Sequence, residues 1–231
     1  IWAAVVNLLR SVGDRIDLSG VQGIGVTSLL GTVLLDEAGD PIGPCMTWAD
    51  RSAHTEVEAL KRQFGLSEIY RSSGKIADAE AAACKLMQIK TRQPERFRRI
   101  RTVVSLKDYI VLKLTGAVAT DPIHASYTLM SDILAGGWNE ALIRELRFPL
   151  PWFPPIRGCV EAVGCVCPEA ATLTGLKEGT PVACGGPDGS VGCFGAGLAR
   201  TGAAVNVIGT TDVFFTVSDR YVEDNQMRFV V

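Results

Sequence analysis

The sequence predicts an α/β fold in which helices flank a mixed sheet. Short apolar segments rich in β-branched residues alternate along the chain with segments of helical periodicity. Hydrophobic residues make up 47% of the 231 residues, which suffices for a sizeable core. No apolar run reaches the roughly 20 residues that a membrane-spanning helix needs. We therefore expect a soluble protein without a membrane partner.

The first half of the chain is predicted to contain a helix, two strands and then a helical region. Residues 1–10 have helical periodicity, but no capping residue precedes Ile1, as expected for a chain cut from a longer one. Strands are predicted at 21–26 and 32–35, followed by a turn at 36–41. The remaining helices of this half are predicted at 50–64, 80–92, 95–99, 107–114 and 139–146.

A proline-rich segment is predicted to separate the two halves. Four prolines between residues 149 and 155 exclude a helix interior or a central strand, so we expect a rigid surface crossing. The elements predicted beyond it are helices at 168–173 and 189–198, a buried strand at 181–184, and a β-hairpin formed by 203–208 and 213–217.

Charge and cysteine content exclude several classes of partner. Lys and Arg number 23 against 25 Asp and Glu, so the net charge is −2 and we expect no nucleic-acid partner. The seven cysteines suit reduced thiols in a cytoplasmic protein. Cys165 and Cys167 have the wrong spacing for a zinc site, and we expect buried strand cysteines rather than metal ligands.

A candidate catalytic residue follows the strand predicted at 181–184. Gly185 and Gly186 end this strand, Asp188 stands at the turn, and a helix of small residues follows at once. Open α/β sheets bind ligands at the carboxyl ends of strands, and glycine lets another group approach the backbone closely. Asp188 is therefore predicted either to point into a cleft or to act only as the helix N-cap.

A second candidate is the turn formed by Gly209, Thr210 and Thr211 between the strands of the predicted hairpin. Its backbone amides and two hydroxyls could converge on a phosphate oxygen. An ordinary hairpin turn is the alternative. The two segments together are more specific than either alone.

Several short blocks follow one another in a characteristic order. They are residues 33–42, 47–51, 107–116, 119–121 with 125–126, 185–188, and 209–211. In this order and spacing they resemble the FGGY family of carbohydrate kinases, most closely its xylulokinase-like and gluconokinase-like members. Each block is weak alone, but the series makes the resemblance specific.

The resemblance implies a ribonuclease-H-like fold of the actin and Hsp70 type. Residues 1–231 would form most of the first, sugar-binding domain of a two-domain kinase. The initial strand hairpins with their phosphate loop and the C-terminal adenine-binding domain are expected to be missing, so that the chain is a fragment, inactive by itself. The family signature Lys-Leu-x-Trp reads Lys85-Leu86-Met87-Gln88 here.

The resemblance also implies a reaction, the ATP-dependent phosphorylation of a hydroxyl on a sugar, sugar acid or polyol. The substrate would be similar to xylulose or gluconate. Asp188 would be the general base that accepts the proton of the attacking hydroxyl, while Mg²⁺ offsets charge on the phosphates of ATP. Gly209, Thr210 and Thr211 would bind phosphate.

Four further residues are implied to contact the substrate. Leu29 and Leu30 stand where the family often has Met-His or Arg-Glu, so a sugar hydroxyl would lose its partner and the substrate is expected to differ from xylulose. Trp48 and Asp50 match a Trp-x-Asp block, in which the indole packs on a sugar face and the carboxylate accepts hydrogen bonds. A core tryptophan and a helix cap are the alternatives for these two residues.

Two other functions remain as alternatives. One is a non-catalytic sugar-binding or regulatory protein of the actin-like superfamily, which the glycine setting of Asp188 disfavours. The other is a dinucleotide binder, but no Gly-x-Gly-x-x-Gly motif follows the first strand. A homodimer is left open. Lys107 and Asp108 are interpreted as structural residues that open a helix.

Overall fold

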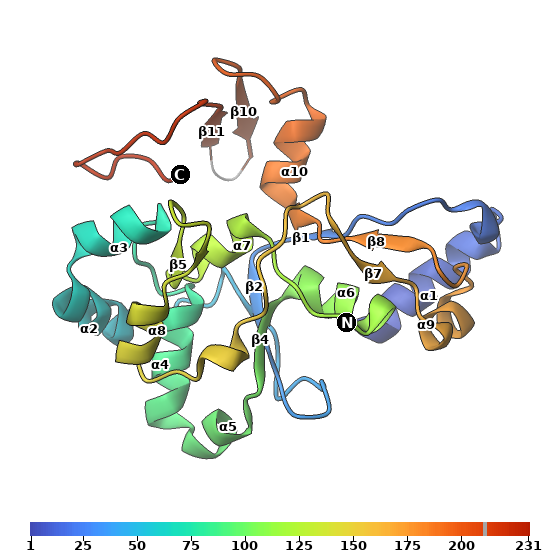
Figure 1. The fold of residues 1–231 in the computed structure, drawn as a ribbon, viewed down its shortest axis with the longest axis horizontal. Helices are drawn as coiled ribbons and strands as arrows, with labels where there is room; N and C mark the ends of the chain where they lie inside the picture. The colour runs from blue at the N-terminus through green and yellow to red at the C-terminus, as the bar shows by residue number, and fades with distance from the viewer. Residues whose placement is uncertain (210–211) are drawn as a thin grey trace.

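The computed structural model describes residues 1–209 and 212–231, and it has the predicted α/β character (Figure 1). The helices are α1 (Trp2–Gly13), α2 (His54–Phe64), α3 (Leu66–Ser73), α4 (Ala82–Arg92), α5 (Pro94–Arg99), α6 (Leu106–Thr115), α7 (Pro122–Tyr127), α8 (Glu140–Glu145), α9 (Pro168–Thr174) and α10 (Asp188–Gly195), with 3₁₀ turns η1 (Leu18–Gly20) and η2 (Leu150–Trp152). The strands are β1 (Thr27–Ser28), β2 (Gly31–Leu35), β3 (Met46–Thr47), β4 (Thr102–Ser105), β5 (Ser131–Asp132), β6 (Gly137–Trp138), β7 (Ala162–Cys165), β8 (Pro181–Ala183), β9 (Gly186–Pro187), β10 (Ala204–Ile208) and β11 (Asp212–Thr216).

Strand β2 lies between two helical layers. It pairs antiparallel with β3 on one side and with β4 on the other. Successive side chains of a strand point to opposite faces. Accordingly Leu34 joins the core formed by α2 to α5 and α8, whereas Val33 and Leu35 pack with Tyr109 of α6 on the other face. Figure 1 shows these helix groups on either side of β2 and β4.

Two extended segments that are distant in sequence run parallel beside each other. Ile24 forms an isolated bridge with Val182, and farther along β1 pairs with β9. Between these contacts Gly185 adopts a φ of +76°, and a Cβ there would lie 2.0 Å from the carbonyl oxygen of Val26. The strand predicted at 21–26 is therefore wrong in extent, because this close backbone approach interrupts the pairing that the apolar pattern predicts.

The proline-rich segment 149–155 is only partly as predicted. It contains no α-helix or strand, and η2 is its one regular turn. Trp152 and Phe153 are each only 7% exposed, however, and belong to the main core. Trp152 meets Phe97 edge-on with ring centroids 5.0 Å apart. The expectation of a surface crossing is wrong, because the prolines fix the backbone while the aromatic side chains between them turn inward.

Most other predicted elements are present, with shifted ends. The hairpin is confirmed as β10 and β11, which stand with α10 at one edge of the molecule (Figure 1). The helix predicted from residue 50 begins at His54. Helices α3 and α7 and strands β4 and β7 were not predicted, because they are short and lie next to stronger signals. The last residues run back to α3, where the backbone amide of Val231 donates to the carbonyl of Gly74 at 2.8 Å.

A buried ionic cluster joins α6, α7 and the end of β8. Lys107 is fully buried, and its Nζ binds Asp108, lies 3.0 Å from Oδ2 of Asp121 and donates to the carbonyl of Cys184 at 2.8 Å. Asp108 also completes a capping box with Ser105 at the start of α6. Burial alone would lower the pKa of Lys107, but Asp108 and Asp121 raise it above its usual value. The structural interpretation of Lys107 and Asp108 agrees with these contacts.

Replacing Lys107 by methionine is expected to destabilise the fold strongly. Met keeps most of the side-chain length, but it leaves two buried carboxylates without their cation. Loss of one partner of a buried ionic cluster costs ~3–5 kcal/mol, which corresponds to a fall of roughly 10 °C in Tm for a chain of this size. Thermal unfolding followed by circular dichroism measures this fall in Tm.

The matched control for this substitution is Lys177→Met. Lys177 is exposed on the turn after α9, so its loss is expected to change stability by less than about 0.5 kcal/mol. Equal Tm values for the two variants would show that the cluster contributes nothing to stability.

Candidate functional site

The parallel contact between β1 and β9 brings two predicted site segments together. Thr27 is in register with Gly186, and Ser28 with Pro187. Because the strands run in the same direction, Leu29 and Leu30 leave the sheet at the same end as Asp188. The sheet therefore unites segments that are more than 150 residues apart.

Asp188 is the first residue of α10, and its side chain is exposed. The N-cap of this helix is Pro187, and no side chain caps it. Within the described residues, the one hydrogen bond to the Asp188 carboxylate comes from the amide of Gly189, at 2.8 Å. The alternative of an N-cap is thus wrong, since the helix begins one residue too early for Asp188 to cap it.

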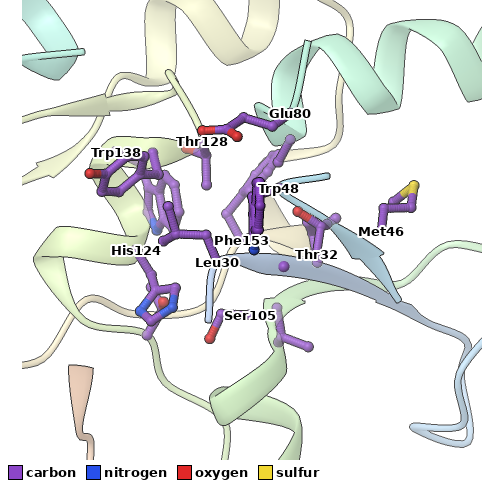
Figure 2. A pocket seen from close by; sticks show the side chains of 16 residues that line it. Leu30, Thr32, Met46, Trp48, Glu80, Ser105, His124, Thr128, Trp138 and Phe153 are labelled. Atoms are coloured by element: carbon purple, nitrogen blue, oxygen red, sulfur yellow. The ribbon is translucent and has the colours of Figure 1, made fainter. Parts of the chain in front are cut away.

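A cavity of about 50 Å³ opens next to Leu30 and Trp48 (Figure 2). A single water needs ~10–15 Å³, so the cavity accommodates several water-sized groups. Its polar lining residues are Thr32, Glu80, Ser105, Thr120, His124, Tyr127 and Thr128. Its other lining residues are Leu30, Gly31, Met46, Trp48, Ala82, Val103, Val104, Trp138 and Phe153. Leu29, Asp50 and Asp188 are not among the lining residues.

Trp48 is a surface tryptophan rather than a core residue. Its side chain is 56% exposed, and its backbone amide donates to the carbonyl of Leu30 at 3.1 Å. This bond extends the pairing of β2 and β3, so the two predicted contact residues stand side by side. An exposed indole on the cavity wall can pack on the C–H face of a sugar.

Asp50 does not cap α2, because the N-cap of that helix is Ala53, three residues after the cap position that the sequence predicts. Its carboxylate instead lies 2.9 Å from Nζ of Lys85, a residue with no exposed side-chain surface. The same Nζ donates to the Asp50 carbonyl at 2.6 Å. Burial works to raise the pKa of Asp50, but hydrogen bonds from Lys85 and Ser52 and the charge of Lys85 lower it to about 2. In the structure Asp50 acts as the counterion of Lys85.

The stability contributed by the Asp50 carboxylate is expected to depend on pH. Its pKa in the folded state is about 2, and in the unfolded state ~3.9. A lowered carboxyl pKa adds stability that is fully present above ~4 and is lost as pH falls towards 2. We expect Asp50→Asn to lower Tm at pH 7, and the difference from wild type to shrink between about pH 4 and pH 2.

The matched control is Asp14→Asn, which changes an exposed carboxylate after α1. It is expected to leave Tm nearly unchanged at pH 7. A Tm difference for Asp50→Asn that stays constant down to pH 2 would contradict an ionic role for Asp50.

Two cavity residues, Glu80 and His124, were not predicted as site residues. Glu80 lies at one end of the cavity and His124 at the other in Figure 2. His124 is carried by α7, whose N-cap is Asp121 and whose first residue is Pro122. An Asp followed by Pro is a common helix start, so this pair was the available signal. No local pattern pointed to Glu80, which precedes α4.

The predicted phosphate-binding turn is described only at its first residue. Gly209 is exposed and directly follows β10. Thr210 and Thr211 lie outside the described residues.

Three features of the described part of the chain bear on ligands and environment. No group of three or more His, Cys, Asp or Glu side chains there is placed to hold a metal ion. No helix within residues 1–209 and 212–231 has the length and apolarity to cross a bilayer. All seven cysteines are free thiols, and Cys165 is exposed. The expectation of buried strand cysteines is wrong at Cys165, because β7 is paired with β8 in a two-stranded sheet and Cys165 is exposed to solvent. It is also wrong at Cys167, which is half-buried and is the N-cap of α9.

The chain is similar to several curated kinases. It is 28% identical to the xylulose kinase of Escherichia coli over 222 residues, which covers 96% of this chain and 45% of that protein. It is 31% identical to the autoinducer-2 kinase of Klebsiella pneumoniae over 215 residues, covering 90% of this chain and 40% of that protein. The chain thus spans less than half the length of these relatives.

Solved structures agree with this similarity. The xylulose kinase of Rhodospirillum rubrum superposes with a TM-score of 0.92 at 28% identity, over 97% of this chain and 47% of that one. The gluconate kinase of Lactobacillus acidophilus has the same fold, with a TM-score of 0.92 at 22% identity, over 99% of this chain and 46% of that one. These superpositions confirm the predicted fold class. Residues 1–195 match the N-terminal domain of the FGGY family of carbohydrate kinases, and the chain belongs to that family.

Proposed function

We propose that this domain binds a small carbohydrate and takes part in its ATP-dependent phosphorylation. The observation that carries the proposal is the placement of Asp188 at the carboxyl end of β9, beside the segment that leads from β1 into the cavity. Family membership supports the same reaction. The carbohydrate lies against Trp48 and Leu30, with its reactive hydroxyl directed to Asp188.

In this proposal Asp188 is the general base. Its exposed carboxylate accepts the proton of the hydroxyl as the oxygen attacks the γ-phosphate of ATP. The one hydrogen bond from Gly189 holds the carboxylate in place and leaves it able to accept a second one. Gly209, with Thr210 and Thr211, is proposed to contact phosphate oxygens.

ATP and Mg²⁺ are the proposed co-substrate and metal ion. Mg²⁺ in such sites is usually held by phosphate oxygens, waters and one or two carboxylates. In this proposal phosphate oxygens and waters hold the ion, and the exposed Asp188 carboxylate stays free to accept the proton. The ion, when bound, offsets negative charge on the phosphates. The free thiols of the seven cysteines support a proposed location in the cytoplasm.

Asp188→Asn is expected to lower kcat of the kinase that contains this domain by at least about 100-fold. Asn cannot take the proton, but its side-chain oxygen can still accept the hydrogen bond from Gly189. Tm should therefore change little. Steady-state kinetics and thermal unfolding on the same preparation measure both quantities.

The control for this variant is Asp219→Asn, which alters an exposed carboxylate after β11. It should keep normal kcat. Near-normal kcat with Asn at position 188 would refute the proposed base and favour a non-catalytic sugar-binding protein.

The substrate is proposed to be a carbohydrate other than D-xylulose. Leu30 lines the cavity and offers only apolar contact, while Leu29 lies outside it. In a substrate panel we expect another sugar or polyol to give the highest kcat/KM. Leu30→His adds a hydrogen-bonding group to the cavity wall, and it is expected to raise kcat/KM for D-xylulose about tenfold, which corresponds to ~1.4 kcal/mol.

The control for this substitution is Leu8→His, at a residue of α1 that is 64% exposed. It should leave the ranking of substrates unchanged. If wild type already prefers D-xylulose over every other substrate in the panel, the substrate proposal is wrong.

A further inference from the structure

The imidazole of His124 is held at one nitrogen and lacks a partner at the other. Nδ1 lies 2.7 Å from Oδ2 of Asp121. Nε2 has no hydrogen-bond partner among the described residues, although the side chain is only 5% exposed. A buried polar atom without a partner costs free energy. Because this ring lines the cavity, a group bound in the cavity can supply the missing partner (Figure 2).

The surroundings of Asp121 decide which nitrogen of His124 carries a proton. Oδ1 of Asp121 accepts hydrogen bonds from the amides of Ile123 and His124, each at 3.0 Å. Burial works to raise the pKa of Asp121, but His124 and Lys107 lower it to about 2, so the carboxylate is ionised and only accepts. Nδ1 must therefore donate to Oδ2. In the neutral ring Nε2 then accepts a hydrogen bond, and in the charged ring it donates one.

A hydroxyl group fits Nε2 in either state, because it can both donate and accept. A carboxylate fits only the charged ring. The cavity lining contains Glu80 and no Lys or Arg, so a bound carboxylate would meet a second acid and no fixed cation. Apolar side chains such as Trp48 and Met46 suit the C–H surface of a neutral carbohydrate.

We propose that Nε2 of His124 binds one hydroxyl group of an uncharged sugar or polyol, and thereby selects against substrates that lack this hydroxyl or carry a carboxylate in its place. The inference rests on the proposed kinase function and names the substrate class of the same site. His124 is a binding residue in this account, and Asp188 remains the base. The position of His124 is secured by Asp121, which the buried Lys107 holds in turn.

His124→Asn is the informative variant. The Asn amide can still donate to Asp121 from near the place of Nδ1, but the side chain is too short to reach the position of Nε2. We expect KM for the preferred uncharged substrate to rise about tenfold, while KM for ATP and Tm stay nearly unchanged. His124→Gln, whose amide reaches the Nε2 position, should recover part of the loss.

Deoxy analogues of the substrate identify the hydroxyl. With wild type, removal of one particular hydroxyl should lower kcat/KM about tenfold, and with His124→Asn the same removal should have little further effect. A merely structural role would produce no such coupling. The control is His54→Asn, which changes the other histidine of the chain, exposed at the start of α2 and outside the cavity.

The outcomes separate this inference from the proposed function. If wild type phosphorylates a carbohydrate and His124→Asn keeps both its KM and its discrimination among deoxy analogues, the inference is wrong and the kinase function stands. The inference is also overturned if a sugar acid is the best substrate. If the wild-type kinase that contains this domain phosphorylates nothing, the proposed function fails, and thermal shifts with the same sugars and polyols then test the hydroxyl site. Stabilisation of wild type that is lost in His124→Asn supports a hydroxyl site, and no stabilisation refutes it.

Discussion

The buried ammonium of Lys107 is the interaction on which the arrangement of the site depends. It lies within hydrogen-bonding distance of Asp108 in its own helix, Asp121 at the start of α7 and the carbonyl at the end of β8. Asp108 and Asp121 belong to the successive helices α6 and α7, and the Cys184 carbonyl lies 77 residues after Lys107. If one member of this cluster is missing, the others remain as buried charges without a partner, and the fold loses stability. The cluster therefore locks α6, α7 and the β8 turn into one geometry.

That geometry connects the two ends of the candidate site. On one side, the Cys184 carbonyl held by Lys107 leads directly into the glycine turn and Asp188. On the other, Asp121 caps α7 and orients His124 towards the cavity. The same cation thus supports both the proposed base and the proposed hydroxyl-binding residue. Asp50, two residues after Trp48, forms a second ion pair with the buried Lys85, although the Asp50 side chain is 37% exposed.

Much of the fold was predictable because its signals are local. Helical patterns bounded by Gly or Pro marked α6 and α9, and apolar segments bounded by turn residues marked β2 and the β10–β11 hairpin. The predictions failed where a distant contact overrides the local pattern. The apolar run at 21–26 is broken by the approach of Gly185 to Val26, and the aromatic residues of the 149–155 segment turn into a core built by α4 and α5.

The sequence by itself determined the fold class, the family resemblance and the placement of Asp188 after a glycine-ended strand, since each depends on residue types and spacing along the chain. Only the tertiary structure decided which side chains share the cavity. Glu80, which precedes α4, and His124 of α7 both line it, although they are 44 residues apart in the sequence. Asp50 is not among the lining residues and pairs instead with the buried Lys85. Contacts between residues far apart in the sequence depend on how helices pack and charges pair in the folded chain, which local patterns do not encode.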